Sequence, residues 1–431
     1  MSRVWSDRLG QAVGQRVRLA GWLHHQRRLS QVTFVLLRDG RGMSQLVVED
    51  GALRMELAGW PPETVLLVEG LVVEAPQAIQ GAELHDPRFT VVAMPEEPLP
   101  FELRRPHLGV QLPTLLDHAA LGWRHPRQRA LGRLAAAAVW GFRTSLDDRG
   151  FVEVQTPKLV ASATEGGANV FPVDYFGRPA FLAQSPQFYK QTMVGVYERV
   201  YETAPVFRAE PHDTARHLAE YFSLDAEMGF ITDHRDVMAL LSEVMAAIFQ
   251  AVADRAPLAV ELLDISLPDL SSEVPRIHFR DAQLLLERET GEAVLGEPDL
   301  APAHERFLGE WAEREYQSEL LFVVGYPMAK RPFYTHPDPE HPEFSNSFDL
   351  LFRGLELVTG GQRLHRYRDY LNALERQDTA PYQGYLQAFR YGMPPHGGFA
   401  IGLERLVARL ARVANVRQVT LFPRDLNRLE P

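Results

Sequence analysis

The stretch that decides the fold of this 431-residue sequence reads Val206-Phe207-Arg208-Ala209-Glu210, followed after a polar loop by Arg216-His217-Leu218-Ala219-Glu220-Tyr221. It predicts a strand that ends in arginine, a loop that carries arginine and histidine, and a return strand. Arginine contacts phosphate oxygens at two points, so this hairpin is suited to hold a polyanion. On this segment alone, the charged tip of an ordinary hairpin remains an alternative.

A second segment lies near the C-terminus. The run Met393-Pro394-Pro395-His396-Gly397-Gly398-Phe399 precedes Gly402-Leu403-Glu404-Arg405, where a helix over 402–413 is predicted to begin. Small residues allow a ligand to approach the backbone closely, and a helix N-terminus favours anions. A plain helix start is the alternative interpretation.

A third segment, 354–363, has the sequence of a strand. Because side chains alternate along a strand, Glu356, Val358 and Gly360 are predicted to share one face. A carboxylate and a nearby hydroxyl can hold Mg²⁺, which prefers oxygen ligands. The alternative is a half-buried strand with a glycine bulge.

Around these segments, residues 124–431 predict one domain. Helices are expected at 127–149, 187–196, 234–254 and 402–413, and strands at 151–154, 200–208, 222–231, 320–324 and 348–359. This order is typical of an α+β fold on an antiparallel sheet. Residues 255–310 match no recognisable pattern and are expected to be a variable insertion.

The N-terminal part has a different pattern. Short β-rich runs at 16–24, 32–38, 44–49, 65–74 and 89–94 predict a small closed barrel of the OB type over residues 1–95. Residues 96–123 are rich in proline, which removes backbone donors, so they are expected to form an extended linker.

Composition excludes several classes of protein. The chain has no cysteine and no long apolar run, so a disulfide scaffold, a thiol nucleophile and a membrane protein are not expected. There is no Walker A loop, no G-x-G-x-x-G after a strand and no H-E-x-x-H. We expect a cytoplasmic enzyme that does not bind a membrane.

Charge and lysine content carry more specific information. The net charge of −11 argues against nucleic acid, yet residues 1–50 hold eight arginines and four acidic residues, or +4. Lysine occurs only at positions 158, 190 and 330, against 42 arginines. A lysine retained in such a chain points to a compact charge that arginine cannot replace.

The segments above, in this order, resemble the three signature motifs of class II aminoacyl-tRNA synthetases. The first motif matches 150–157, which ends in Pro157, the second matches 207–210 and the third matches 402–405. The barrel-first order and the ending Leu421-Phe422-Pro423-Arg424-Asp425 resemble the subgroup for aspartate, asparagine and lysine, and within it the archaeal-type aspartyl enzymes. The resemblance implies an OB-type barrel, a catalytic domain on an antiparallel sheet flanked by helices, and a homodimer with Pro157 at its interface.

The resemblance also implies ATP and Mg²⁺ as ligands. Arg208 would hold the α-phosphate of ATP, Glu210 would contact the adenine edge, and His217 and Arg405 would hold the β- and γ-phosphates. Tyr221 would stack on one face of adenine, and the Arg405 guanidinium would stack on the opposite face of adenine. The catalytic set is then Arg208, Glu210 and Arg405, and the remaining ATP-binding residues are Arg216, Leu218, Glu356 and Gly402. Glu356 and Thr359 would hold the metal.

The amino-acid substrate follows from charge. Lys190 and Arg363 would converge on the substrate side chain, and two cations there select a carboxylate over an amide. Asparagine enzymes of this subgroup generally lack that lysine; the alternative is that Lys190 lies on the surface of its helix. The other residues implied for L-aspartate are Glu165, Ser185, Asp225 for the ammonium group, Gln187 and Thr359.

The barrel would read RNA. OB barrels stack bases on aromatic side chains, and Phe34 lies mid-strand where the family stacks the central anticodon base. Arg27, Gln45 and Glu83 match positions that hydrogen-bond that base. His24 resembles forms that charge both tRNA-Asp and tRNA-Asn, whereas Ile79 matches neither type.

These residues predict an aspartate–tRNA ligase that acts on tRNA-Asp and also on tRNA-Asn, with an amidotransferase downstream. Alternatives are an aspartyl enzyme restricted to tRNA-Asp, an asparaginyl-tRNA synthetase, a tRNA-independent asparagine synthetase, and an inactive RNA-binding scaffold. Lys190 argues against the asparaginyl enzyme, the retained barrel against the asparagine synthetase, and intact Arg208 and Arg405 against the scaffold.

Overall fold

The protein is described by a computed structural model over residues 3–162, 169–375 and 379–430. The chain divides into two compact units, residues 1–111 and 112–431. Each unit has its own hydrophobic core, so each is considered by itself.

The first unit is a closed β-barrel, as predicted. Its strands follow the order β1 (Arg16–Arg28), β2 (Thr33–Arg38), β3 (Met43–Val48), β5 (Ala82–Ala93) and β4 (Val65–Glu74) around the barrel. Alternate side chains, such as Val35 and Leu37, fill the interior, because successive residues of a strand point to opposite sides. The sequence did not predict the 3₁₀ helices η1 (Ser6–Ala12) and η2 (Ile79–Gly81) or helix α1 (Gly51–Leu57).

The extended linker predicted over residues 96–123 is present in only part of that segment. Residues 94–111, all within the described part, form neither helix nor strand. The end of the predicted linker instead folds into α2 (Leu112–Asp117) and α3 (Ala119–Gly122), which belong to the second unit. Most of the prolines precede these two helices, so the proline-rich composition of the whole segment did not indicate that its end is helical.

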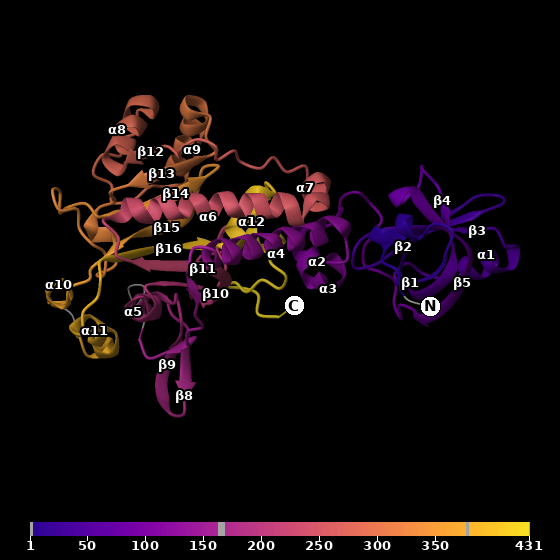
Figure 1. Ribbon diagram of the computed structural model, residues 1–431, viewed down its shortest axis with the longest axis horizontal. Helices are drawn as coiled ribbons and strands as arrows, with labels where there is room; N and C mark the ends of the chain where they lie inside the picture. Colours follow the sequence, from indigo (N-terminus) through magenta and orange to yellow (C-terminus); the bar gives the residue numbers. More distant parts are fainter. Residues whose placement is uncertain (1–2, 163–168, 376–378, 431) are drawn as a thin grey trace. The chain divides into compact units, whose positions relative to one another are not determined.

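An eight-stranded sheet forms the centre of the described part of residues 112–431 (Figure 1). Its order is β12 (Arg276–His278), β13 (Leu320–Val324), β14 (Ser347–Phe352), β15 (Leu355–Arg363), β16 (His396–Gly402), β11 (Glu220–Gly229), β10 (Arg199–Phe207) and β6 (Val152–Glu153). The strands from β13 to β10 are antiparallel, as expected, whereas the edge strands β12 and β6 pair in parallel.

Two long helices pack together across the sheet, α4 (Pro126–Asp147) and α6 (His234–Arg255) (Figure 1). Among the described residues, α6 alone is long and apolar enough to cross a membrane by length and composition. Its apolar face, including the fully buried Leu241, Val244 and Ile248, is part of the main core, which identifies it as a core helix. The short helix α12 (Leu403–Leu410) joins the same core.

The uninterpreted residues 255–310 are a folded part of the sheet edge. They form α7 (Pro257–Leu263), β12, α8 (Phe279–Thr290) and the start of α9 (Pro302–Tyr316). Helices α8 and α9 share a separate core with β13 (Figure 1). This segment therefore extends the sheet and also supplies a site residue described below.

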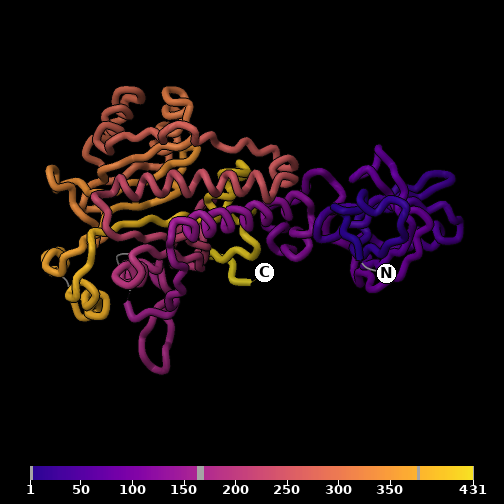
Figure 2. Tube along the Cα trace, viewed as in Figure 1, coloured from indigo at the N-terminus to yellow at the C-terminus, as the bar shows by residue number. Residues whose placement is uncertain are grey.

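Smaller elements surround the sheet. Helix α5 (Gln187–Tyr197) packs with α10 (Tyr367–Ala373) and α11 (Gln383–Arg390), and β7 (Leu159–Val160), β9 (Arg178–Leu182) and β8 (Pro172–Tyr175) form a small separate sheet. Figure 2 shows the C-terminal segment running back beside α4, where the Trp123 indole donates to the Leu421 carbonyl (2.9 Å).

Candidate active site

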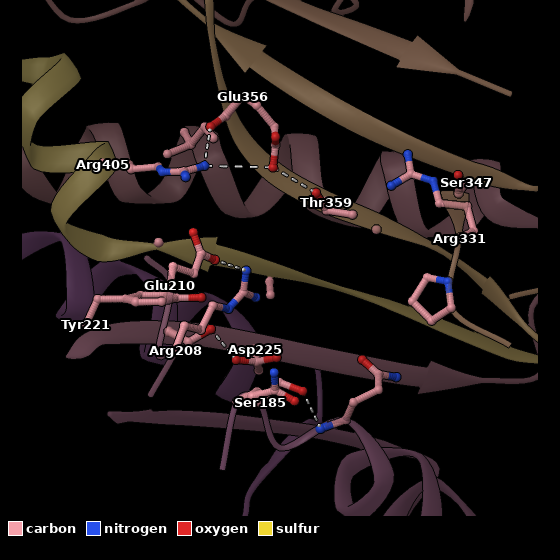
Figure 3. A pocket seen from close by; sticks show the side chains of 18 of the residues that line it. Ser185, Arg208, Glu210, Tyr221, Asp225, Arg331, Ser347, Glu356, Thr359 and Arg405 are labelled. Carbon is pink, nitrogen blue, oxygen red and sulfur yellow. Dashed lines mark hydrogen bonds and ion pairs between the residues drawn. The ribbon is translucent and has the colours of Figure 1, made fainter. Parts of the chain in front are cut away.

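A cavity of about 540 Å³ in the second unit gathers the residues that the sequence singled out. Every residue predicted there for ATP, aspartate or metal lines it, except Glu165, which lies outside the described residues. Its walls come from α5, β11, β15, β16 and the start of α12, together with the loop between β10 and β11, and Figure 3 shows part of this lining. The predicted members present are Ser185, Gln187, Lys190, Arg208, Glu210, Arg216, His217, Leu218, Tyr221, Asp225, Glu356, Thr359, Arg363, Gly402 and Arg405.

The hairpin of β10 and β11 carries the anion-binding side chains. Val206 pairs with Tyr221 and Phe207 with Glu220, so the loop between them projects from the end of the hairpin. The Arg208 guanidinium lies 5.6 Å from the Tyr221 ring centre and 4.0 Å from a Glu210 oxygen (Figure 3). Tyr221 and Arg208 thus form one wall of the cavity.

The C-terminal segment holds this loop in place. The buried Arg417 donates to the Thr214 carbonyl (2.9 Å) and pairs with Asp213 and Asp425 at 2.5 Å each. The Ala219 amide donates to the Arg424 carbonyl at 2.7 Å. These contacts explain why the ending 421–425 belongs to the recognisable pattern.

His217 lies between charges of both signs. Its Nε2 is 3.5 Å from Glu210 and its Nδ1 is 2.6 Å from the Thr214 hydroxyl. Burial lowers the pKa of His217; Glu210 opposes that shift, and the Arg405 and Arg216 charges add to it. An anion entering the cavity would favour the protonated ring.

One residue here comes from the segment that the sequence left uninterpreted. Glu305 on α9 is buried, accepts the Glu356 amide at 2.9 Å and lies 3.4 Å from Arg216. Burial raises the pKa of Glu305, and the Glu356 charge adds to that rise. Glu305 therefore fixes the position of Arg216 and of the strand that carries Glu356, a role that no local pattern could have indicated.

The predicted strand 348–359 is a hairpin, β14 and β15, and this changes which side chains meet. The register slips so that Leu350 faces Val358 while Leu351 faces Glu356, which leaves Leu357 as an extra residue. The prediction that Glu356 and Val358 share a face was therefore wrong. Val358 is buried in the core, and the Thr359 hydroxyl instead donates to the Glu356 carboxylate at 3.1 Å (Figure 3).

Asp349, which the sequence analysis missed, faces Thr359 from the neighbouring strand. Burial raises the pKa of Asp349 to about 6; the Arg331 charge, 3.1 Å away, opposes this and the Glu356 charge adds to it. For Glu356, burial raises the pKa, but the Arg405 charge and the Thr359 hydroxyl outweigh it. The Glu356 charge thus disfavours the ionised form of Asp349, and a divalent cation beside the two carboxylates would relieve that repulsion.

These residues fit Mg²⁺. No cluster of three or more histidine, aspartate or glutamate side chains occurs among the described residues. Mg²⁺ bound with a nucleotide uses one or two carboxylates plus phosphates, which matches Asp349 and Glu356 beside the Thr359 hydroxyl. Bound there, the ion would neutralise phosphate charge.

We expect the Asp349→Asn substitution to weaken Mn²⁺ binding in the presence of ATP at least about 10-fold, because a ligand-site carboxylate is lost. Electron paramagnetic resonance of free Mn²⁺ measures this directly, without turnover. The exposed Glu340 provides the matched control as Glu340→Gln. Unchanged Mn²⁺ affinity in the Asp349 variant would exclude Asp349 from the metal site.

The other end of the cavity is a buried ion-pair cluster. Lys190 on α5 contacts Asp225 (2.9 Å), Glu227 (3.3 Å) and the Phe399 carbonyl (3.4 Å). Lys190 is 1% exposed, so it is not a surface lysine. Arg363 donates to Glu227 from its Nε at 3.0 Å, which links both predicted cations through one carboxylate.

Glu227 was missed because nothing in the sequence places it beside Lys190. It is completely buried; burial raises its pKa, but the Arg363 and Lys190 charges outweigh burial and lower it. A Cβ atom at Gly398 would lie 2.1 Å from this carboxylate and 2.1 Å from the Ala226 carbonyl. The glycine at 398, which we had associated with ligand approach, therefore makes room for Glu227.

A buried polar network supports this cluster from behind. Gln187 donates to Gln191, and Gln191 in turn contacts the Tyr385 hydroxyl (2.9 Å) and His396 Nε2 (3.0 Å). Burial lowers the pKa of His396 to about 4, so the ring is neutral near pH 7. The network fixes Gln187 and α5 without adding charge. The Ser185 hydroxyl accepts the Gln187 amide at 3.3 Å.

On the barrel, the predicted anticodon residues largely share an outer face. Phe34 lies opposite Arg27 on β1, and Gln45 hydrogen-bonds Glu83 at 2.9 Å. Ile79 lies exposed in the short 3₁₀ helix η2 (Ile79–Gly81). His24 is different: it is the extra residue of a bulge in β1 and is only 7% exposed.

Pro157 lies exposed after the edge strand β6. The segment that carries it is anchored by the buried Glu202, which accepts the Thr156 amide (2.8 Å) and pairs with Lys158 (2.9 Å). This contact accounts for one of the three lysines as a structural residue.

A closed β-barrel, and a largely antiparallel sheet whose cavity joins an arginine-rich hairpin loop to a buried ion-pair cluster, are the features of a class II aminoacyl-tRNA synthetase. Residues 17–92 match the OB-fold nucleic acid binding domain, and residues 111–426 match the class II tRNA synthetases (D, K and N). The chain belongs to this family, the class II synthetases for aspartate, lysine and asparagine.

Named relatives cover the whole length. The aspartate–tRNA(Asp/Asn) ligase of Thermus thermophilus is 46% identical over 97% of both chains. The aspartate–tRNA(Asp/Asn) ligase of Deinococcus radiodurans is 43% identical over 100% of this chain and 99% of that protein. The asparaginyl-tRNA synthetase of Pyrococcus horikoshii, solved with asparaginyl-adenylate, has a TM-score of 0.93 and 32% identity over 100% of both chains.

Proposed function

We propose that this chain is an aspartate–tRNA ligase. It activates L-aspartate with ATP and transfers the aspartyl group to tRNA. The observation that carries the proposal is the buried cluster of Lys190, Arg363, Asp225 and Glu227 at one end of the cavity. The phosphate-binding arginines occupy the other part.

Charge in this cluster favours aspartate. Its two cations and two carboxylates sum to zero in the protein alone. Aspartate brings an ammonium group, for Asp225, and a side-chain carboxylate, for Lys190 and Arg363, so the sum stays zero. The α-carboxylate is common to both amino acids and is directed toward the α-phosphate of ATP, outside this sum. Asparagine brings the ammonium group to the cluster without a side-chain carboxylate and would leave one uncompensated positive charge in a buried site, which is costly.

The chemistry has two steps. The aspartate α-carboxylate attacks the α-phosphorus of ATP and displaces pyrophosphate, and a terminal ribose hydroxyl of tRNA then attacks the aspartyl carbonyl and releases AMP. Arg208 holds the α-phosphate where negative charge develops, while His217 and Arg405 hold the departing phosphates. Glu210 and Tyr221 orient adenine. Glu356, Thr359 and Asp349 would hold Mg²⁺, which would supply positive charge at the phosphates. Glu165 and Ser185 assist Asp225 and Gln187 in holding the amino acid.

Fold alone does not separate this activity from an asparaginyl enzyme, because a solved asparaginyl-tRNA synthetase has nearly the same fold. Pyrophosphate exchange into ATP, measured separately with aspartate and with asparagine, tests the choice. We expect exchange with aspartate and at least about 10³-fold less with asparagine at equal concentration, since a mismatched buried charge costs several orders of magnitude. Preferential exchange with asparagine would overturn the proposal.

For the RNA partner, we propose tRNA-Asp and also tRNA-Asn. Two full-length relatives carry both tRNAs in their names, and His24 is the residue that relaxed forms tend to have. Phe34 would stack the central anticodon base, with Arg27, Gln45 and Glu83 around it and Ile79 nearby. Aspartyl-tRNA-Asn would then need an amidotransferase downstream.

A homodimer in the cytoplasm completes the proposal. Pro157 and the two-residue edge strand β6 offer an open sheet edge for a second copy.

A further inference from the structure

A second groove, of about 440 Å³, lies on the barrel at the end of the sheet formed by β2 and β3. None of its lining residues belongs to the active site or to the proposed anticodon residues, although η1, which supplies several of them, packs against η2, which carries Ile79. Its lining combines three arginines and two glutamines with three apolar residues, and its members are Arg3, Val4, Trp5, Arg8, Gln11, Ala12, Gln15 and Arg41.

A buried carboxylate builds the groove. Asp39, 5% exposed, accepts the Ser6 amide (2.7 Å) and hydroxyl (2.6 Å), and also accepts the amides of Arg41 (2.7 Å) and Gly42 (2.9 Å). One side chain therefore fastens the start of η1 to the turn between β2 and β3. The two walls of the groove are fixed relative to each other before any ligand arrives.

Trp5 positions the arginines. The Arg3 guanidinium lies 3.8 Å from the Trp5 ring centre, and that of Arg41 lies 4.9 Å from it. Stacking holds a guanidinium in a defined plane and leaves its N–H edges available to an anion. One N–H group of Arg3 donates a hydrogen bond to the Ala20 carbonyl (3.0 Å).

The charge of the groove favours an extended polyanion. Arg3, Arg8 and Arg41 are exposed and face one nearby acid, Asp7, 3.3 Å from Arg41. An exposed pair of this kind contributes at most about 1 kcal/mol and breaks readily. Two guanidinium groups on an aromatic ring, with the exposed Arg8 in the same groove, match the combination with which proteins follow a nucleic-acid backbone.

We propose that this groove binds phosphates of the tRNA backbone, at a place separate from the anticodon bases. Phe34 lies on β2 four residues before the strand ends at Arg38, a distance of about 13 Å at about 3.3 Å per residue, and Arg41 lies in the turn beyond. A nucleic-acid strand bound at Phe34 therefore has to continue past the end of β2 to reach the groove. The inference rests on the proposed tRNA ligase function, and it adds an affinity that does not depend on sequence.

The test uses the full chain and a tRNA-Asp transcript. The Arg3→Gln, Arg8→Gln and Arg41→Gln triple variant is expected to bind about 100- to 500-fold more weakly at 0.1 M salt, from about 5- to 8-fold for each lost phosphate contact. The slope of log Kd against log salt should fall by about 2 to 3. An anticodon-substituted tRNA should show the same fold-loss, because phosphate contacts carry no base information.

Controls separate the outcomes. Arg88→Gln removes an exposed arginine of β5 outside the groove. The slope of log Kd against log salt should then differ from that of the wild type by no more than about 1, the value for one phosphate contact. Arg8→Gln alone, which breaks no contact with the barrel core, keeps the test valid if the triple variant unfolds. Unchanged affinity and slope in these variants would overturn the inference. Absence of aspartate-dependent pyrophosphate exchange, assayed without tRNA, would instead overturn the proposed function.

Discussion

Replacing Lys190 with methionine is expected to lower aspartate activation by at least about two orders of magnitude. Lys190 is 1% exposed and contacts Asp225 and Glu227, so the substitution leaves both carboxylates buried with one cation fewer. Breaking a buried ion pair costs about 3–5 kcal/mol. A loss of that size in the transition state lowers kcat/KM about 10²- to 10⁴-fold. Pyrophosphate exchange at varied aspartate measures it.

The Lys158→Met variant is the matched control. Lys158 also pairs with a buried carboxylate, Glu202, at 2.9 Å, but it does not line the cavity. We expect this variant to lose some thermal stability and to keep the wild-type KM for aspartate. If Lys190→Met folded and retained the wild-type KM and kcat for aspartate, the amino-acid pocket would be misassigned.

The Gly398→Ala substitution is expected to destabilise the second unit by about 3 kcal/mol or more, because it overpacks a filled interior. The added Cβ would lie 2.1 Å from both the Glu227 carboxylate and the Ala226 carbonyl. The backbone of β11 cannot move without disturbing its pairing with β16, so Glu227 must shift. The bridge to Lys190 and Arg363 would then break, and the KM for aspartate should rise more than that for ATP.

The control for this substitution is Gly384→Ala on α11, where nothing lies within 4 Å of the added carbon. Alanine favours a helix over glycine by up to about 1 kcal/mol, so this variant should be unchanged or slightly more stable. Urea unfolding compares the two. Equal stability of the Gly398 variant and wild type would show that the glycine does not make room for Glu227.

Local patterns predicted most of the fold. The barrel strands, the long helices 126–147 and 234–255, and the Arg208 hairpin were each recognisable because periodicity, turns and charge lie within one short segment. The cavity residues were recognisable for the same reason, since each motif carries several of them. These residues lie in one cavity because the strands that carry the motifs are neighbours in the same sheet.

What escaped prediction depends on contacts between distant segments. Glu227, Asp349 and Glu305 are acidic residues with no local signature, and each matters through a partner 35 or more residues away or on another strand. The bulge at Leu357, which turns Glu356 toward Thr359, depends on the register with β14. Sequence spacing within one strand predicts strict alternation and cannot show such a slip.

The most direct measurement is aspartate charging of purified tRNA-Asp and tRNA-Asn by the full-length protein with ATP and Mg²⁺. The proposed function predicts that radiolabelled aspartate becomes attached to both tRNAs, and that asparagine becomes attached to neither. Charging of tRNA-Asp alone would contradict the relaxed specificity. Attachment of asparagine, or of no amino acid to either tRNA, would contradict the central claim that this chain is an aspartate–tRNA ligase.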